Sequence, residues 1–192
     1  MTNESLGLLK PTLWRTCRTL ANRTRLKLFQ TVLLKPGVTV NEIAKTLKID
    51  PALTSKYLRD LNARGLLSAA RRAANVYYRV KANPSVPQAS SLISALVETF
   101  RADERASDVI FRKATAFTQP RRVAIVHELA QRPARFIELH RRLGISKTAL
   151  KRHLRKLDAR GFLRCTERRG VYAVINAGTP LEMALLKLAE KT

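Results

Sequence analysis

Two stretches of the chain, 96 residues apart, share one pattern, and this repeat limits the possible folds more than any other feature. In residues 145–163 three leucines recur at the spacing of one helix face, and Gly161 stands where a helix would end at its C′ position. Residues 50–67 repeat the pattern. The matched residues are Leu58 with Leu154, Leu61 with Leu157, Ala-Arg-Gly at 63–65 with Ala-Arg-Gly at 159–161, and Leu67 with Leu163. The repeat predicts an internal duplication, and therefore a fold of two similar units.

The second of these helices is almost purely cationic outside its leucine stripe. Both stretches begin with residues that are typical of helix starts: Asp50 and Pro51 in the first, and Ser146 in the second. The basic residues after Ser146 are Lys147, Lys151, Arg152, Arg155, Lys156 and Arg160, and Asp158 is the one acid. Solubility alone would be served by balanced charges. Because the major groove of DNA admits a helix and its backbone is anionic, the pattern favours a DNA-recognition helix over a solvated basic helix.

The length of 192 residues and the repeat predict two domains, residues 11–101 and 102–192. Units of roughly 60–80 residues are marginally stable alone, so we expect them to pack on each other. No long uncharged apolar run predicts a membrane span, and the first residues do not resemble a secretory signal. Cys17 and Cys165 give no disulfide framework and favour a reducing cytoplasm.

The net charge of +23 is concentrated in the two repeats. Residues 22–80 carry a net charge of +9 and residues 118–175 carry +11, so the rest of the chain is nearly neutral. Two positive regions joined by neutral segments indicate a polyanion that is contacted at two places. A membrane surface is a weaker interpretation, because no basic amphipathic helix with a Trp, Phe and Leu face is present.

Each repeat is expected to hold the same order of elements. The first has helices at 25–34, 41–47 and 51–62 and strands at 66–70 and 76–80, with the turn of the hairpin at 71–75. The second has helices at 122–130, 136–143 and 147–158 and strands at 162–166 and 171–175. Further helices are expected at 11–21, 88–101, 103–117 and 181–191. This order of two close helices and a β-hairpin is that of a winged helix.

Each unit resembles the winged-helix repressors of the ArsR (arsenic-repressor-like) class, the first more closely than the second. Residues 20–26 (Leu-Ala-Asn-Arg-Thr-Arg-Leu) resemble the opening "LADPTRL" of that family, residues 41–44 its "ELA", and residues 76–80 its "VYYRL" wing strand. The second unit keeps Gln119, the following Pro-Arg-Arg and residues 138–139, but has Ala173 in place of the second wing tyrosine. The resemblance implies a regulator that binds double-stranded DNA.

The fold class expected is mainly α with small β-hairpin wings, in two tandem winged-helix domains. ArsR-like chains dimerise through their first and last helices, and each unit here has such a pair. The resemblance therefore implies a pseudo-dimer within one polypeptide, monomeric unless it associates further. The alternative is that these helices belong to the core of their own unit.

Residues predicted to contact DNA are those of each recognition helix that the leucine stripe leaves exposed, together with the arginines of the wings. In the first unit they are Ala52, Ser55, Lys56, Arg59, Arg71 and Arg72; in the second they are Lys147, Thr148, Lys151, Arg152, Arg155, Arg168 and Arg169. Arg and Lys can pair with guanine, whereas other contacts reach only phosphate. Tyr77 and Tyr78 are interpreted as packing residues of the wing.

Neither a metal site, a cofactor site nor a catalytic site is predicted. The Cys-x-Cys of metal-sensing relatives would fall on Thr39 and Asn41, which are not ligands for zinc or arsenic. The three histidines lie on three different elements and are interpreted as surface or packing residues. No phosphate-binding loop or paired carboxylates indicate an enzyme.

The sequence thus predicts a cytoplasmic transcriptional regulator, a repressor, whose two recognition helices enter successive major grooves about 34 Å apart. Because the second helix is far more basic, a lopsided target site is expected. Open alternatives are a replication initiator or nucleoid-architectural protein, a protein-interaction adaptor, and a regulator with an effector between the units.

Overall fold

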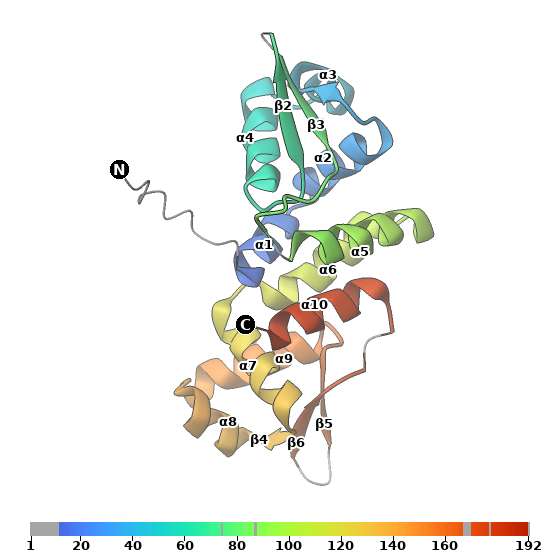
Figure 1. Cartoon of the computed structure of the whole chain (residues 1–192). Helices are drawn as coiled ribbons and strands as arrows, with labels where there is room; N and C mark the ends of the chain where they lie inside the picture. Colours follow the sequence, from blue (N-terminus) through green and yellow to red (C-terminus); the bar gives the residue numbers. More distant parts are fainter. Residues whose placement is uncertain (1–11, 74, 87, 167–169, 177, 192) are drawn as a thin grey trace, which may run out of the picture.

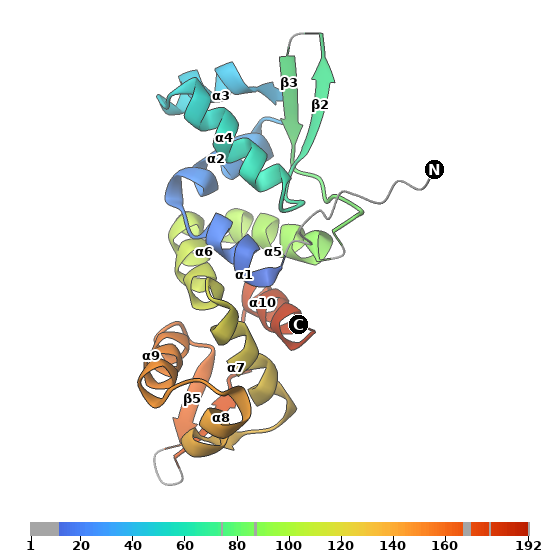
Figure 2. The ribbon, with the colours of Figure 1, turned by 90° about the vertical axis from the view of Figure 1, so that its left-hand side faces the viewer.

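Two lobes lie at opposite ends of the molecule and a waist of helices joins them (Figures 1 and 2). The computed structural model describes residues 12–73, 75–86, 88–166, 170–176 and 178–191. The waist consists of α1 (Leu13–Leu20), α5 (Ala89–Ala102), α6 (Ala106–Ala114) with the short 3₁₀ turn η1 (Thr115–Phe117), and α10 (Pro180–Glu190).

Each lobe has the same order of elements. The upper lobe holds α2 (Arg23–Leu34), β1 (Val38–Thr39), α3 (Val40–Leu47), α4 (Pro51–Asn62), β2 (Ser68–Arg72) and β3 (Asn75–Arg79). The lower lobe holds α7 (Pro120–Gln131), β4 (Ala134–Arg135), α8 (Phe136–Leu143), α9 (Lys147–Asp158), β5 (Leu163–Thr166) and β6 (Val171–Val174). Both sheets are antiparallel, with the strand orders β1-β3-β2 and β4-β6-β5. This mainly helical architecture with small sheets is compatible with a winged helix–turn–helix.

The helices α4 and α9 bury the predicted leucine stripe against the core. Leu58 and Leu61 of α4 are fully buried, as are the stripe residues of α9. The side chain of Asp50 accepts a hydrogen bond from the amide of Leu53, so the predicted start of α4 is confirmed. Ser146 occupies the N-cap position of α9, but its side chain makes no capping hydrogen bond.

Gly161 ends α9 as predicted. The last regular residue of α9 is Asp158, and Gly161 adopts a left-handed φ of 77° just beyond the helix. The amide of Gly161 donates to the carbonyl of Asp158 and the amide of Phe162 donates to that of Leu157, which are the two hydrogen bonds of a Schellman motif with the glycine at C′. Helix α6 begins at Ala106 and not at 103, because the carboxylate of Asp103 accepts the amide of Arg105 and holds a separate turn.

The first strand of the upper wing begins two residues later than predicted. Leu66 and Leu67 are fully buried below the end of α4, and the amide of Leu66 donates to the carbonyl of Leu61. Strand pairing starts only at Ser68, which faces Arg79. Arg71 and Arg72, predicted in the turn, therefore lie in β2, where they pair with Val76 and Asn75. The lower-lobe strands differ from the prediction by one residue at one end.

The waist helices pack on each other across the two halves of the chain. Helix α5 packs along α10, and α1 packs against α6 and η1 (Figure 1). The buried residues of both lobes and of the waist form one continuous apolar cluster, from Leu13 to Ala189. Arg23 of α2 forms an ion pair with Asp108 of α6 at 2.8 Å, and Lys113 of α6 forms one with Glu182 of α10. The boundary at residue 101 remains a prediction.

Candidate nucleic-acid interface

The predicted groove-facing residues of both helices lie on the surface. In α4, Ala52, Lys56 and Arg59 are exposed and Ser55 is half-buried. In α9, all five predicted residues are exposed, namely Lys147, Thr148, Lys151, Arg152 and Arg155. Because the leucines hold the opposite face of each helix in the core, these side chains are free to meet a ligand outside the lobe.

The face of α9 opens onto a basic hollow of about 740 Å³. The lining residues are Arg122, Thr148, Lys151, Arg152, Arg155, Lys156, Ala159 and Arg160. No carboxylate is among these described residues. Burial lowers the pKa of Lys156, and the nearby positive charges of Arg160 and Arg122 lower it further. The sequence did not predict Arg122, Lys156 and Arg160 as parts of this surface. Arg122 comes from α7, and the other two were interpreted only as positive charge on the helix.

Arg122 ties the start of α7 to the end of the preceding helix. It is 8% exposed; its Nε donates to the carbonyl of Ala116, and its Nη2 donates to the carbonyl of Thr115 at 3.1 Å and to Thr118 Oγ1 at 2.6 Å. Arg25 of α2 does the same in the upper lobe, where it donates to the carbonyls of the last turn of α1. These arginines hold each lobe against the waist.

The corresponding hollow beside α4 contains a carboxylate. It measures about 400 Å³ and is lined by Trp14, Arg15, Arg18, Thr19, Arg25, Asp60 and Arg64. Nη1 of Arg25 lies 3.4 Å from Oδ2 of Asp60, and the Arg25 guanidinium stacks over the ring of Tyr57 at 5.2 Å. The positive charge of the hollow beside α4 is thus partly neutralised by Asp60, whereas no carboxylate lines the hollow beside α9.

The wings contribute two described arginines. Arg71 and Arg72 are exposed in β2, beside the hairpin turn at which Ala73 has a φ of 51°. Tyr78 is buried, which confirms it as a packing residue, and burial raises its pKa; Tyr77 is half-buried. Arg168 and Arg169 lie outside the described residues.

Helices α4 and α9 lie on adjacent sides of the long axis. In Figure 2, α4 crosses the near face of the upper lobe, and α9 lies at the left edge of the lower lobe. Figure 1 agrees, with α4 on the left of the upper lobe and α9 behind the lower one. The two helices therefore do not lie on a single flat face of the molecule.

The thiols and histidines show no metal-binding arrangement. In the part of the chain that the structure describes, no group of three or more His, Cys, Asp or Glu side chains could hold a metal ion. Nδ1 of His127 lies 2.8 Å from the carbonyl of Glu190, and Nδ1 of His140 lies 2.7 Å from that of Ile145. Cys17 is buried in the waist, and burial strongly raises the pKa of its thiol, which keeps it protonated. Cys165 is exposed.

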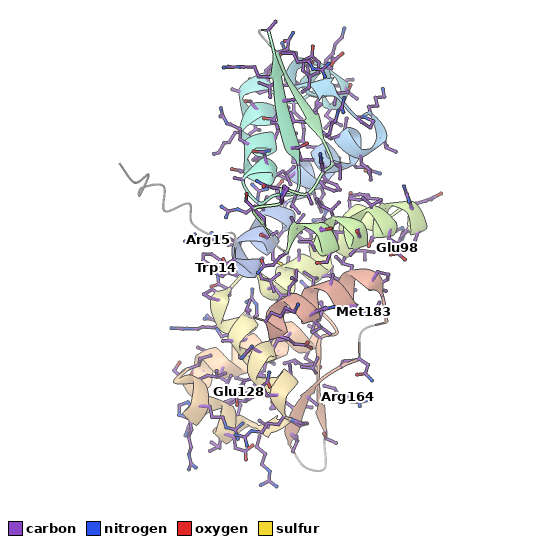
Figure 3. All side chains as sticks on the ribbon, in the orientation of Figure 1. Trp14, Arg15, Glu98, Glu128, Arg164 and Met183 are labelled. Carbon is purple, nitrogen blue, oxygen red and sulfur yellow. The ribbon has the colours of Figure 1, made fainter. Side chains whose placement is uncertain are left out.

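An apolar pocket of about 280 Å³ lies where the waist meets the lower lobe. It is lined by Thr12, Leu13, Trp14, Pro120, Val123, Ala124, His127, Glu128 and Leu143. Figure 3 shows Trp14 at the waist and Glu128 below it on the same side of the molecule. The pocket joins α1, from the first half of the chain, to α7 and α8 of the second.

Comparison with known families gives one match in the lower lobe. Residues 119–164 match the family model of the bacterial regulatory protein, arsR family. The matched stretch contains α7, β4, α8 and α9 and reaches β5. This supports a DNA-binding transcriptional regulator with a helix–turn–helix of the ArsR type. The match falls in the half in which we expected the weaker resemblance.

No curated protein matches the chain. Among the described residues, none of the helices has the length and apolar character needed to cross a membrane.

Proposed function

We propose that the protein is a sequence-specific repressor of transcription that binds one DNA duplex with both α4 and α9. The observation that carries the proposal is the surface of α9: its exposed residues are cationic or hydroxyl-bearing over most of its length, and it lies inside the segment that matches the arsR family. The protein would act in the cytoplasm by occupying the DNA that polymerase needs.

The second half of this proposal is that the chain is a tandem duplication arranged as a monomeric pseudo-dimer. Three observations support it. Both lobes have the same element order and strand order. Arg25 and Arg122, each the third residue of its helix, bind the end of the preceding helix in the same way. The flanking helices α5 and α10 pack along each other at the waist, between the lobes.

A lopsided target follows from the unequal charges of the two helices. Asp60 of α4 is matched by Lys156 at the same position of α9, so the lower lobe presents more positive charge to the phosphates. A symmetric operator mirrors symmetric protein halves. We therefore propose a non-palindromic site, in which the half contacted by α9 contributes most of the binding energy.

Fluorescence anisotropy with a labelled duplex tests the proposal through its salt dependence. With about 6–10 phosphate contacts, the affinity should fall by roughly 10³–10⁵ between 50 and 200 mM salt. The double variant Lys151→Ala/Arg155→Ala should reduce the logarithmic salt slope by about 1.8, since each lost contact removes about 0.9. Lys187→Ala, on the exposed side of α10, is the matched control and should leave the slope unchanged. A weak slope, or equal slopes for both variants, would contradict the proposal.

Two alternatives bind different partners or sites. A replication initiator or nucleoid-architectural protein would bind one origin or would bind along the chromosome, whereas a regulator would bind at promoters. A protein-interaction adaptor would bind no duplex at all, and the concentration of positive charge in the lobes disfavours it.

The apolar pocket favours a regulator that also responds to a ligand. Because α1 and α7 share its walls, a small apolar molecule held there would couple the first half of the chain to the second. A screen of small apolar compounds by thermal shift tests this, with Ala124→Phe as the variant that fills the pocket. Stabilisation of the wild type alone supports it, and equal stabilisation of both proteins contradicts it.

A further inference from the structure

A basic cup of about 370 Å³ lies at the N-terminus of α7. It is lined by Gln119, Pro120, Arg121, Arg122, Arg152 and His153. Pro120 is the first residue of this twelve-residue helix, and the side chain of Gln119 makes no capping hydrogen bond. Pro120 has no amide hydrogen, and the amides of Arg122 and Val123 donate to the carbonyl of Gln119. This end of the helix therefore contributes the positive end of its dipole to a cup that is already surrounded by guanidinium groups.

His153 provides a second, independent indication that the cup holds a ligand. It is 5% exposed, and neither Nδ1 nor Nε2 has a hydrogen-bond partner among the described residues. Buried polar groups in proteins are almost always paired, so an unpaired imidazole in the wall of a cavity indicates a missing partner. The ring can donate one hydrogen bond when neutral and two when charged.

The charges around the cup are all positive. Arg121 and Arg122 face His153 from α7, and Arg152 comes from its own helix. Burial and these three arginines, in the order Arg122, Arg152 and Arg121, lower the pKa of His153. Burial and Arg152 also lower the pKa of Arg122. Only an anion would relieve this repulsion, and the described residues that line the cup include no carboxylate.

The upper lobe shows how the chain neutralises the same position when it supplies its own groups. The seventh and tenth residues of α4 are Tyr57 and Asp60, whose counterparts in α9 are His153 and Lys156. Tyr57 covers the Arg25 guanidinium, and Asp60 pairs with it. The lower lobe has an imidazole and an ammonium group at these two positions, and no carboxylate of the described residues pairs with Arg122, so we expect its counter-anion to be a bound ligand.

We infer that this cup, formed by the N-terminus of α7 with Arg121, Arg122, Arg152 and His153, is a binding site for a phosphate group. Forked guanidinium groups and helix N-termini both suit phosphate oxygens. Arg122 and Arg152 also line the hollow along α9, so the cup continues the surface that faces DNA. The phosphate group comes either from the DNA backbone, which rests on the proposed function, or from a free phosphorylated molecule.

Titration of the full chain with inorganic phosphate, without DNA, tests the inference. The chain has three histidines, so ¹⁵N-histidine NMR resolves His153 from His127 and His140. At constant ionic strength, with chloride replaced by phosphate, we expect a saturable change at His153 alone and a rise of its pKa. Equal changes at all three histidines, or a change that chloride reproduces, would overturn the inference.

Lys156→Asp makes the test sharper, because it copies Asp60 and gives the lower lobe an internal carboxylate. We expect it to weaken phosphate binding at least tenfold. Lys187→Asp on α10 makes the same change of charge away from the cup and should bind as the wild type does. If the two variants bind phosphate equally well, the site is not the one inferred. Circular dichroism of both variants verifies that they are folded.

Addition of a duplex then identifies the source of the phosphate. If the DNA backbone occupies the cup, duplex and inorganic phosphate compete, and Lys156→Asp weakens duplex binding more than Lys187→Asp does. If a free phosphorylated molecule occupies it, the response of His153 to phosphate persists in the complex. Both outcomes support the site. A protein that binds phosphate at His153 but binds no duplex would retain the site and contradict only the proposed function.

Discussion

Arg122 is a single buried residue that fixes the start of α7, and with it the lower lobe, to the preceding segment. Its guanidinium supplies donors to two backbone carbonyls and one hydroxyl at the end of the preceding segment. Removal of a buried donor leaves these acceptors unpaired, at a cost of about 1–3 kcal/mol for each buried group. Arg121, its neighbour, is exposed and makes no such contact in the described part of the chain.

We therefore expect Arg122→Ala to lower the free energy of unfolding by at least about 2 kcal/mol. Arg121→Ala should change it by less than about 0.5 kcal/mol, as is usual for surface positions. Urea unfolding followed by circular dichroism measures both. Equal losses in the two variants would mean that the hydrogen bonds of Arg122 do not hold the lobe.

A second prediction at this scale concerns pH. The pKa of His153 is lowered below its ordinary value of 6.5 by burial and by Arg122, Arg152 and Arg121. Above pH 6.5 the ring is neutral in both the folded and the unfolded chain. As the pH falls from 6.5 through the lowered pKa, the unfolded chain takes up the proton first, so stability is lost.

The melting temperature of the wild type should therefore fall more steeply between pH 7 and pH 5 than that of His153→Gln. The two proteins have the same carboxylates, so the difference between their curves isolates the contribution of His153. Parallel curves for the two proteins would show that His153 does not take up its proton at a cost to the fold.

At the scale of single elements, the sequence predicted the helices well, because each depends on local signals. Asp50 and Pro51 begin α4, and the leucine stripes identify the buried faces of α4 and α9. The strands were less accurate. Leu66 and Leu67 have the composition of a strand, but they fill the core below α4, and only the tertiary structure decides between these two uses.

The turn between the two helices of the lower helix–turn–helix gives a prediction for one element. Gly144 adopts a left-handed φ of 61°, and a Cβ at this position would meet no atom within 4 Å. Gly144→Ala should therefore cost only the backbone strain, about 1–2 kcal/mol. Chemical denaturation measures it. A stabilised variant would mean that the turn does not require this conformation; Lys48 accepts it in the upper lobe, with a φ of 53°.

The candidate site was predicted in part. The exposed residues of α4 and α9 follow from the leucine stripe, since the opposite face of a helix must point outward. Arg122 and His153 could not be placed in this way. Arg122 reaches the cup from α7, whereas His153 lies on the buried side of α9, where the spacing of residues predicts packing. Their chemistry depends on what the fold brings beside them.

At the scale of the whole molecule, the packing of α5 along α10 and of α1 against α6 sets how α4 and α9 are placed relative to each other. Charge sorting in the sequence predicted two positive regions with a neutral connection, and the lobes and waist have that distribution. The sequence could not predict that α4 and α9 lie on adjacent sides of the long axis (Figure 2). A duplex that meets both must therefore follow a curved path.

Hydroxyl-radical footprinting of one duplex that the protein binds tests most directly whether a single chain contacts DNA with both lobes. We predict two protected segments whose centres are about 10 base pairs apart, or a multiple of that spacing. Lys56→Ala/Arg59→Ala should remove one segment, and Lys151→Ala/Arg155→Ala should remove the other and weaken binding more. One protected segment that is unaffected by Lys56→Ala/Arg59→Ala would show that α4 does not contact DNA. It would contradict the proposal that both lobes bind one duplex.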